Sequence, residues 1–273
     1  MTRDDPRPLI LVSNDDGVNA LGNVALRRSL ARIADVYTVA PEHEQSAKSH
    51  AISLHVPLRY RTVSPNVHAV DGTPADCVYV ALFMESLLPR RPDLVVSGIN
   101  HGANLGTDVH YSGTVAAARE AALRGIPSIA FSNLHHGNME AMAELATSLC
   151  ERMLTSLQSA TRDAEGHAPL LNVNFPDRPM PRGVIATSFG QRHYAEGVDL
   201  RDDPRGRPYF WIGGAGGVHH PEMPGSDTEA VDAGFVSVAP LSLRVTDTQQ
   251  LGLAAFVAGP TDDPQPDPTQ ETP

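Results

Sequence analysis

Apolar residues in the first two thirds of the chain alternate between short unbroken runs and helical spacing. Residues 9–12 form an unbroken apolar run, which is typical of a central strand covered on both faces. From Leu21 to Ile33 apolar positions recur at helical spacing opposite arginines, and residues 36–40 form a second apolar run. Strand, helix and strand within about thirty residues predict a βαβ unit whose strands are parallel.

The same alternation continues as far as residue 176. Two prolines favour edge or antiparallel strands between residues 52 and 70, and Thr73 and Asp76 have the spacing of a capping box that opens a helix ending near residue 88. The remaining elements that we expect are a strand at 94–96, a helix from Ser112 to Gly125, a strand at 128–131, a helix at 139–158 and a strand at 170–175. This order predicts an α/β fold, with a mostly parallel sheet between two helical layers over residues 1–176.

Beyond residue 176 the pattern changes to short strand candidates separated by polar, turn-rich segments. We expect a smaller β-rich extension over residues 177–258, built of antiparallel hairpins, with Tyr209 and Trp211 as packing residues. Because an isolated hairpin is marginal in water, the extension should dock on the core or on another subunit. Residues 259–273 are acidic and proline-rich, which predicts a disordered tail.

The first apolar run ends in an acidic turn, Asn14-Asp15-Asp16-Gly17. In an open α/β sheet, ligands bind beyond the carboxyl ends of the strands. Adjacent carboxylates repel each other unless a positive charge lies between them, and hard oxygen ligands favour Mg²⁺, Mn²⁺ or Ca²⁺. Taken alone, the same pattern is also typical of a solvated acidic turn.

Two other turns can reach the same edge of the sheet if their strands are neighbours. Ser46 follows the second strand and Asn100 follows the strand at 94–96. Together with the two acids they would form an all-oxygen site suited to Mg²⁺ or Mn²⁺. The helix opened by Ser112, Gly113 and Thr114 offers free backbone N–H groups and a positive dipole end, which attract phosphate. A divalent cation beside such an anion site indicates phosphoryl chemistry.

Bulk properties exclude several classes of function. The 273-residue chain has a net charge of −11, which disfavours binding to nucleic acid or to an anionic membrane surface. It has no long apolar span, and its first eight residues are polar and unlike a secretory signal, so we expect a cytoplasmic protein. Cys77 and Cys150 lie in apolar surroundings and are expected to be buried free thiols.

Other catalytic motifs fit poorly. The glycines at 213–217 do not follow the dinucleotide-binding pattern, and no P-loop, H-E-x-x-H or G-x-S-x-G sequence occurs. The pairs His135-His136 and His219-His220 are more typical of exposed loops than of zinc sites.

Several motifs taken together closely resemble the SurE family, the stationary-phase survival proteins that act as 5′-nucleotidases. The motifs that carry the resemblance are LVSNDDG at 11–17, GTPADCV at 72–78, SGINHGANLG at 97–106, YSGTV at 111–115, GIPSIA at 125–130, DPRGRPY at 203–209 and GFVSVAPL at 234–241. The resemblance covers nearly everything except the two ends of the chain.

This resemblance implies a Rossmann-like core and a C-terminal hairpin exchanged between subunits, in a homodimer or homotetramer. It implies hydrolysis of nucleoside monophosphates that depends on one divalent cation per subunit, Mg²⁺ or Mn²⁺. Carried over by position, the family's metal ligands are Asp15, Asp16, Ser46 and Asn100, and its phosphate-contacting residues are Asn104, Ser112, Gly113 and Thr114. We expect Asp15, Asp16 and Asn104 to take part in catalysis.

The chain departs from the family pattern after the second strand. Family members commonly have Arg-Ser-Gly there, whereas this chain has Gln45-Ser46-Ala47-Lys48. The departure keeps the serine ligand but affects loop conformation and substrate preference.

Our hypothesis is that the metal binds a phosphate oxygen and a water whose pKa it lowers, and that this water attacks phosphorus in line. Whether Asp15 or Asp16 takes the proton, or attacks directly, stays open, although the Asp-x-Asp spacing of phosphatases that form an aspartyl-phosphate is absent. The alternatives are a non-catalytic module that senses nucleotide or metal, a phosphatase acting on 3′-nucleotides or polyphosphate, and a structural protein.

Overall fold

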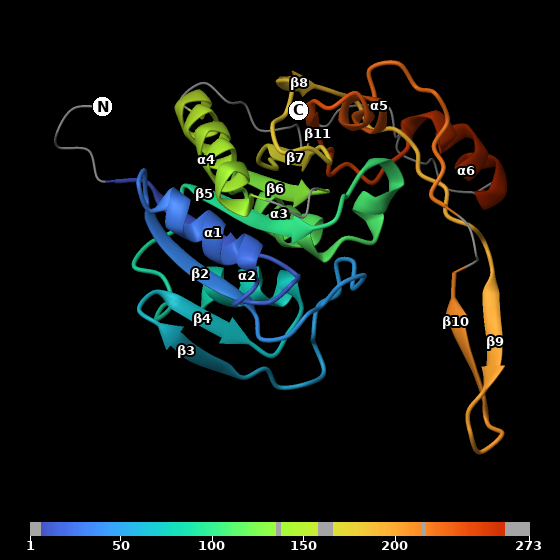
Figure 1. Cartoon of the computed structure of the whole chain (residues 1–273), viewed down its shortest axis with the longest axis horizontal. Coiled ribbons are helices and arrows are strands. Elements are labelled where there is room, and N and C mark those ends of the chain that lie inside the picture. Colours follow the sequence, from blue (N-terminus) through green and yellow to red (C-terminus); the bar gives the residue numbers. More distant parts are fainter. Residues whose placement is uncertain (1–6, 135–137, 158–165, 214–216, 260–273) are drawn as a thin grey trace. The chain divides into compact units, whose positions relative to one another are not determined.

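The computed structural model describes residues 7–134, 138–157, 166–213 and 217–259. It divides into a first compact unit, residues 1–241, and a second unit that begins at Ser242. Within the first unit a nine-stranded sheet has the order β3-β4-β2-β1-β5-β6-β7-β11-β8 (Figure 1). Its strands are β1 (Leu9–Ser13), β2 (Asp35–Pro41), β3 (Tyr60–Ser64), β4 (Val67–Val70), β5 (Leu94–His101), β6 (Ser128–Asn133), β7 (Leu170–Phe175), β8 (Val184–Ala186) and β11 (Val236–Pro240).

The sheet is mostly parallel, as the sequence predicts. The six strands from β4 to β7 run parallel to their neighbours, while β3 and β11 are antiparallel to β4 and β7. Within the segment 52–70, the predicted edge strand is confirmed by β3, which is antiparallel to β4. However, β4 is an inner strand parallel to β2, and residues 52–59 form no strand.

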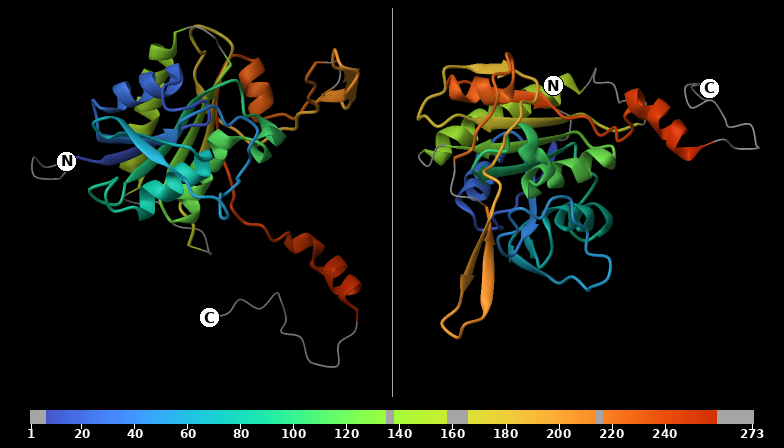
Figure 2. Two further views of the ribbon diagram at one scale, coloured as in Figure 1. Left: turned by 90° about the horizontal axis from the view of Figure 1, so that it is seen from below. Right: turned by 90° about the vertical axis from the view of Figure 1, so that its right-hand side faces the viewer.

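Helices cover both faces of this sheet (Figures 1 and 2). The helices of the first unit are α1 (Leu21–Leu30), α2 (Pro74–Phe83), α3 (Gly113–Leu123), α4 (Met139–Ser156) and α5 (Asp227–Asp232). Ile10 and Val12 of β1 pack in one cluster with α1 and α4, whereas Leu11 packs in another with α2 and α3. The apolar run at 9–12 is therefore a central strand buried on both faces, and the two-layer prediction is confirmed.

Local capping signals fix where two of the helices begin. The hydroxyl of Thr73 accepts from the backbone N–H of Asp76, and the Asp76 carboxylate accepts from the backbone N–H of Thr73. This capping box confirms the predicted start of α2, although the helix ends at Phe83 rather than near residue 88. Ser112 caps α3 by accepting from the backbone N–H of Val115 at 3.0 Å.

The strands after residue 176 pair differently from the prediction. We expected antiparallel hairpins, but β8 and β11 are parallel to each other and extend the main sheet. Their apolar residues, Val184, Val236 and Val238, pack against the large core cluster, and that burial decides their partners. The proposed boundary at residue 176 remains a prediction.

One antiparallel hairpin does form in this region. Strands β9 (Val198–Asp202) and β10 (Pro208–Ile212) make a two-stranded sheet separate from the main one (Figure 2). Tyr209 and Trp211 were expected to be packing residues, but their exposed fractions here are 41% and 63%. With only two strands, the hairpin cannot cover both of its own faces.

The second unit contains a helix where we expected β structure. Its described part has α6 (Leu251–Ala258), which presents exposed Leu253, Phe256 and Val257. The apolar residues there are consecutive rather than alternating, so the period-two pattern of a strand is missing. Apart from Gly259, the predicted disordered tail lies outside the described residues.

Two further observations concern the whole chain. Cys77 and Cys150 are buried and free, as expected. Among the residues that the structure describes, no helix has both the length and the apolar character needed to cross a membrane.

Gly22 provides a test of how closely α1 packs on β5. A Cβ atom at residue 22 would lie 1.9 Å from the carbonyl oxygen of Ile99, so Gly22→Ala should lower the free energy of unfolding by about 3 kcal/mol. Urea unfolding measures this change. The matched control is Gly217→Ala, since nothing lies within 4 Å of a Cβ there. Equal midpoints for the two variants would contradict the close approach.

Candidate functional site

The three turns that carry the candidate ligands meet at one edge of the sheet. Strand β1 lies between β2 and β5 and is parallel to both, so the carboxyl ends of the three strands are adjacent. The backbone N–H of Gln45, after β2, donates to the carbonyl oxygen of Asp15 at 2.8 Å. The backbone N–H of His101, at the end of β5, donates to Asp16 Oδ2 at 3.1 Å. The condition that these strands be neighbours is therefore met.

Asp15 lies directly against the start of α3. Its side chain is buried, and the Thr114 hydroxyl donates a hydrogen bond to Asp15 Oδ1. A Cβ atom at Gly113 would lie 2.9 Å from the Cβ of Asp15, so only glycine allows this approach. The acidic turn and the predicted anion-binding helix start are thus parts of one site.

Burial changes the acidity of both carboxylates. The pKa of Asp15 is raised to about 6, chiefly by burial and also by the charge of Asp16, while the hydrogen bond from Thr114 opposes the rise. The pKa of the half-buried Asp16 is also raised by burial, with Glu44 adding to the rise and His101 opposing it. Two buried, adjacent acids are costly to ionise together, and a cation between them would remove that cost.

Several buried oxygen atoms beside the acids lack partners. Asn14 donates its side-chain N–H to the carbonyl oxygen of Gly17 at 2.9 Å, but its Oδ1 has no hydrogen-bond partner. Ser13 of β1 and Ser97 of β5 are register partners, and their buried hydroxyls also have none. A buried polar atom without a partner is unfavourable unless a ligand, ion or water satisfies it. This donor set fits a hard divalent cation, which prefers oxygen ligands.

Ser46 and Asn100 lie close to the acids but are engaged elsewhere. The exposed Ser46 hydroxyl donates to Glu44 Oε1 at 2.9 Å. Asn100 is the penultimate residue of β5 rather than part of the turn after it, because the strand continues past an irregularity between Ser97 and Asn100. Its side-chain N–H donates to the carbonyl oxygen of Gly102 at 3.0 Å, which leaves the side-chain oxygen as the atom able to bind a cation. Among the described residues, neither side chain bonds directly to a carboxylate of the acidic turn.

Asn104 is held at the ends of β6 and β7. Its side-chain N–H donates to the hydroxyl of Ser132 at 2.7 Å, and its backbone N–H donates to Asn174 Oδ1 at 2.8 Å. The side chains of Asn172 and Asn174 both donate to its carbonyl oxygen. Our sequence analysis missed these partners, although two asparagines spaced two apart in an otherwise apolar strand were the signal.

Distant residues brace the segment from Gly98 to Gly113. The fully buried Asp227 accepts from the backbone N–H of Gly106 at 2.9 Å and from that of Gly190 at 2.7 Å, and burial raises its pKa. Asp108, in the 3₁₀ helix Gly106–His110, pairs with Arg192 and accepts from the Tyr194 hydroxyl at 2.7 Å. Sequence analysis missed this brace because its residues lie more than eighty positions apart.

The histidine pair at 219–220, which the structure describes, does not form a metal centre. In the described part of the chain, no cluster of three or more His, Cys, Asp or Glu side chains could hold a metal ion. His219 is exposed and His220 bonds to Asp232 at 2.8 Å, while His135 and His136 lie outside the described residues. A metal bound within the described residues would therefore need mixed ligands, such as the two acids with amide and hydroxyl oxygens.

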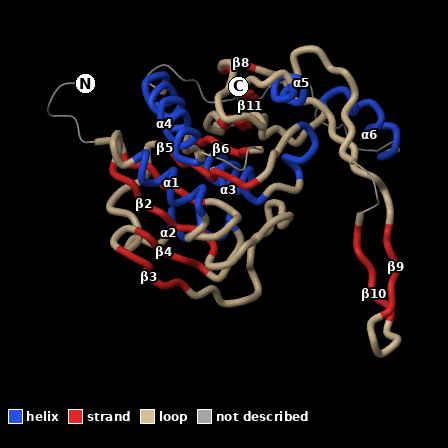
Figure 3. Tube along the Cα trace, viewed as in Figure 1, coloured by secondary structure: helices blue, strands red, loops and turns tan. Residues whose placement is uncertain are grey.

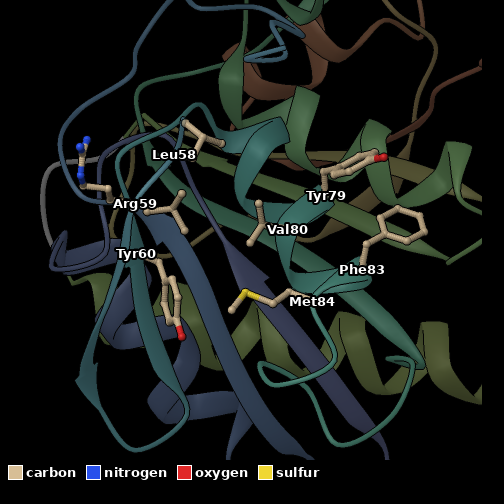
Figure 4. Close-up of a pocket in the computed structure, with 8 residues that line it drawn as sticks. Leu58, Arg59, Tyr60, Tyr79, Val80, Phe83 and Met84 are labelled. Atoms are coloured by element: carbon tan, nitrogen blue, oxygen red, sulfur yellow. The ribbon is translucent and has the colours of Figure 1, made fainter. Parts of the chain in front are cut away.

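An apolar pocket lies elsewhere on the described structure. It has a volume of about 500 Å³ and is lined by Leu58, Arg59, Tyr60, Val70, Tyr79, Val80, Phe83 and Met84 (Figure 4). It contains none of the candidate site residues.

Comparisons with known proteins agree with these features. Residues 10–196 match the family model described as survival protein SurE. The chain is 55% identical over 259 residues to 5′-nucleotidase SurE of Sorangium cellulosum, covering 94% of this chain and 98% of that protein. It is 46% identical over 248 residues to 5′-nucleotidase SurE of Polaromonas naphthalenivorans, covering 89% and 94%.

The fold also has a solved counterpart. The crystal structure of the SurE protein from Aquifex aeolicus superimposes with a TM-score of 0.76 at 35% identity. The match covers 92% of this chain and 100% of that one.

Asp15→Asn should stabilise the metal-free protein at neutral pH. The ordinary pKa of the carboxyl is 3.8 and its folded pKa is about 6, so the folded protein keeps a proton that the unfolded chain releases between these values. The wild-type free energy of unfolding should therefore fall as pH rises from about 4 to about 6. The variant should show a smaller fall, since Asp16 and Asp227 also have raised pKa values, and should be more stable by about 3 kcal/mol at pH 7.

Urea unfolding in the presence of a chelator, at pH 4 and pH 7, measures the difference. Asp35→Asn, which removes an exposed carboxylate, is the control and should keep the wild-type pH dependence. An unchanged pH dependence in Asp15→Asn would show that another group is responsible.

Proposed function

The chain belongs to the SurE family and is a 5′-nucleotidase, and we propose that its active site is the edge of the sheet where the Asp15-Asp16 turn meets the start of α3. The observation that carries this proposal is the contact between the buried Asp15 and the residues Gly113 and Thr114. It puts a carboxylate pair next to a helix start that attracts anions. Cation and phosphate sites must be adjacent for phosphoester hydrolysis of this kind.

The proposed metal ligands are those expected from the sequence. Asp15 and Asp16 supply carboxylates, Asn100 supplies its side-chain oxygen, and Ser46 would exchange its bond to Glu44 for the metal. A site with only two carboxylates, in which other positions are left for water, suits Mg²⁺ or Mn²⁺. When bound, such a cation would stabilise charge on the phosphate and lower the pKa of a water nucleophile.

Ser112 and Thr114, at the start of α3, are proposed to bind phosphate through different groups. The hydroxyl of Thr114 holds Asp15, so its contribution to phosphate binding would come from its backbone N–H. The hydroxyl oxygen of Ser112 accepts from Val115 and keeps its own O–H for a phosphate oxygen. Donors fixed by a helix cap need no reorganisation as charge builds on the phosphate.

Asn104 is proposed as a further phosphate contact. Four hydrogen bonds, to Ser132, Asn172 and Asn174, fix its backbone and side chain. One side-chain N–H is used on Ser132, which leaves the second to donate to the substrate.

The C-terminal hairpin is proposed to join subunits. Strands β9 and β10 expose Leu200, Phe210 and Trp211 at fractions above 60% and pair only with each other. A two-stranded sheet with such side chains is expected to be covered by another protein surface. We propose a second copy of this chain, in a homodimer or homotetramer, with the core over 1–176 and the extension over 177–258.

The proposal predicts metal-dependent phosphate release. The purified protein should release phosphate from nucleoside 5′-monophosphates with Mn²⁺ or Mg²⁺, lose the activity in a chelator and regain it when the metal is restored. Asp16→Asn should lower kcat by about a hundredfold or more, because a carboxylate that holds the cation is lost. A phosphate-release assay measures these changes.

The control is Asp35→Asn, which changes an exposed acid at the start of β2 and should leave kcat unchanged. Tight binding of a nucleoside monophosphate without phosphate release would instead support the sensing module. Release from 3′-nucleotides or polyphosphate at a greater kcat/KM would change the assigned substrate.

A further inference from the structure

The loop that carries Ser46 is held against the site by contacts on both sides. We call residues 42–59, between β2 and β3, the β2–β3 loop (Figure 3). Its Gln45 is bonded to Asp15, and the backbone N–H and hydroxyl of Ser49 donate to the carbonyl oxygens of Tyr111 and His110 at 3.0 and 2.6 Å. The loop therefore touches both the acidic turn and the segment just before α3.

The backbone of this loop is strained on either side of Lys48. Ala47 and Ser49 have φ values of 57° and 51°, in the left-handed region that favours glycine. Non-glycine residues keep such angles only when surrounding contacts hold them. The loop conformation that presents Ser46 thus depends on its anchors.

His50 makes the anchor that reaches furthest along α3. Its Nε2 lies 2.9 Å from Glu120 Oε2, and Nε2–H must be the donor because a carboxylate can only accept. The side chain of Glu120 is 3% exposed and that of His50 is 20% exposed. The bond joins the loop to the same helix whose first residues form the proposed phosphate site.

Glu120 is itself firmly fixed. It accepts from Arg124 Nε at 2.8 Å, and the Arg124 guanidinium lies 5.2 Å from the centre of the Tyr79 ring and 5.7 Å from that of Phe83. Figure 4 shows these two rings side by side on α2. Burial raises the pKa of Glu120, but the hydrogen bonds from His50 and Arg124 outweigh it and lower the pKa overall. His50 therefore binds an ionised, immobile acceptor.

We propose that His50 is a positioning residue for this active site: by donating to Glu120 on α3, it holds the β2–β3 loop so that Ser46 is presented beside Asp15. This inference rests on the proposed function, in which Ser46 is a metal ligand. The far end of the loop is anchored separately, since Ser53 donates to both oxygens of Asp76 at 2.8 and 2.7 Å. Loss of the His50 bond should therefore loosen the residues around Ser46, which would keep only the bonds of Gln45 and Ser49, without unfolding the protein.

Three substitutions at residue 50 test the bond itself. His50→Ala removes the donor, and His50→Asn has a side-chain nitrogen that is too short to reach. His50→Gln carries an N–H the same number of bonds from the backbone as imidazole Nε2. The control is His55→Ala, a histidine of the same loop that is exposed.

The measurements are the Mn²⁺ dissociation constant of the metal-free protein by calorimetry, backbone hydrogen exchange of residues 45–52, and kcat and KM for adenosine 5′-monophosphate. His50→Ala and His50→Asn should weaken Mn²⁺ binding about tenfold, speed exchange and lower kcat more than they raise KM. His50→Gln and His55→Ala should behave as wild type. The urea midpoint should fall only slightly in His50→Ala and His50→Asn, because Arg124 still bonds to Glu120, and should stay the same in the other two variants.

Several outcomes would overturn the inference. Wild-type Mn²⁺ affinity in His50→Ala would do so, as would equal losses in His50→Ala and His50→Gln. A Mn²⁺ loss that simply follows a lowered urea midpoint would indicate a purely structural role. Absence of Mn²⁺ binding by the wild-type protein would instead refute the proposed function, on which the inference rests.

Discussion

The site depends on the packing of Asp15 against the first turn of α3. Burying a carboxylate is costly, and here the cost is offset locally by a hydroxyl donor from Thr114 and by the positive end of a helix. The contact requires glycine at residue 113, because any side chain there would collide with Asp15. The proposed cation site and the proposed anion site are therefore in direct van der Waals contact.

Features encoded by neighbouring residues could be predicted from the sequence. The apolar run before Asp15, the capping box at Thr73 and the cap at Ser112 are short-range patterns, and the structure contains all three. The parallel pairing of β1 and β2 also follows from βαβ connectivity, whereas the position of β5 beside β1 was only a condition of the site and comes from the structure. The turns that carry the candidate ligands could thus be assigned to one edge of the sheet, on the condition that their strands are neighbours.

Features that depend on distant partners could not be predicted. The alternation in residues 184–186 and 236–240 indicates strands but not that they join the main sheet, because strand pairing is decided by burial against the core. Asn100 was placed in a turn because Gly98 interrupts an apolar strand, yet β5 continues through it. The bonds of Asp227 and Asp108 join segments that are far apart in the chain, and no local sequence pattern predicts that they pair.

The bond from Asp227 to Gly106 spans 121 residues of chain. During synthesis, the segment around Gly106 leaves the ribosome long before its acceptor exists, so this part of the site can mature only after most of the polypeptide has emerged. Pairings over such separations are slow to form, since the intervening chain must be ordered first. A nascent chain would therefore be expected to gain its enzymatic competence late, as one of the last events of folding.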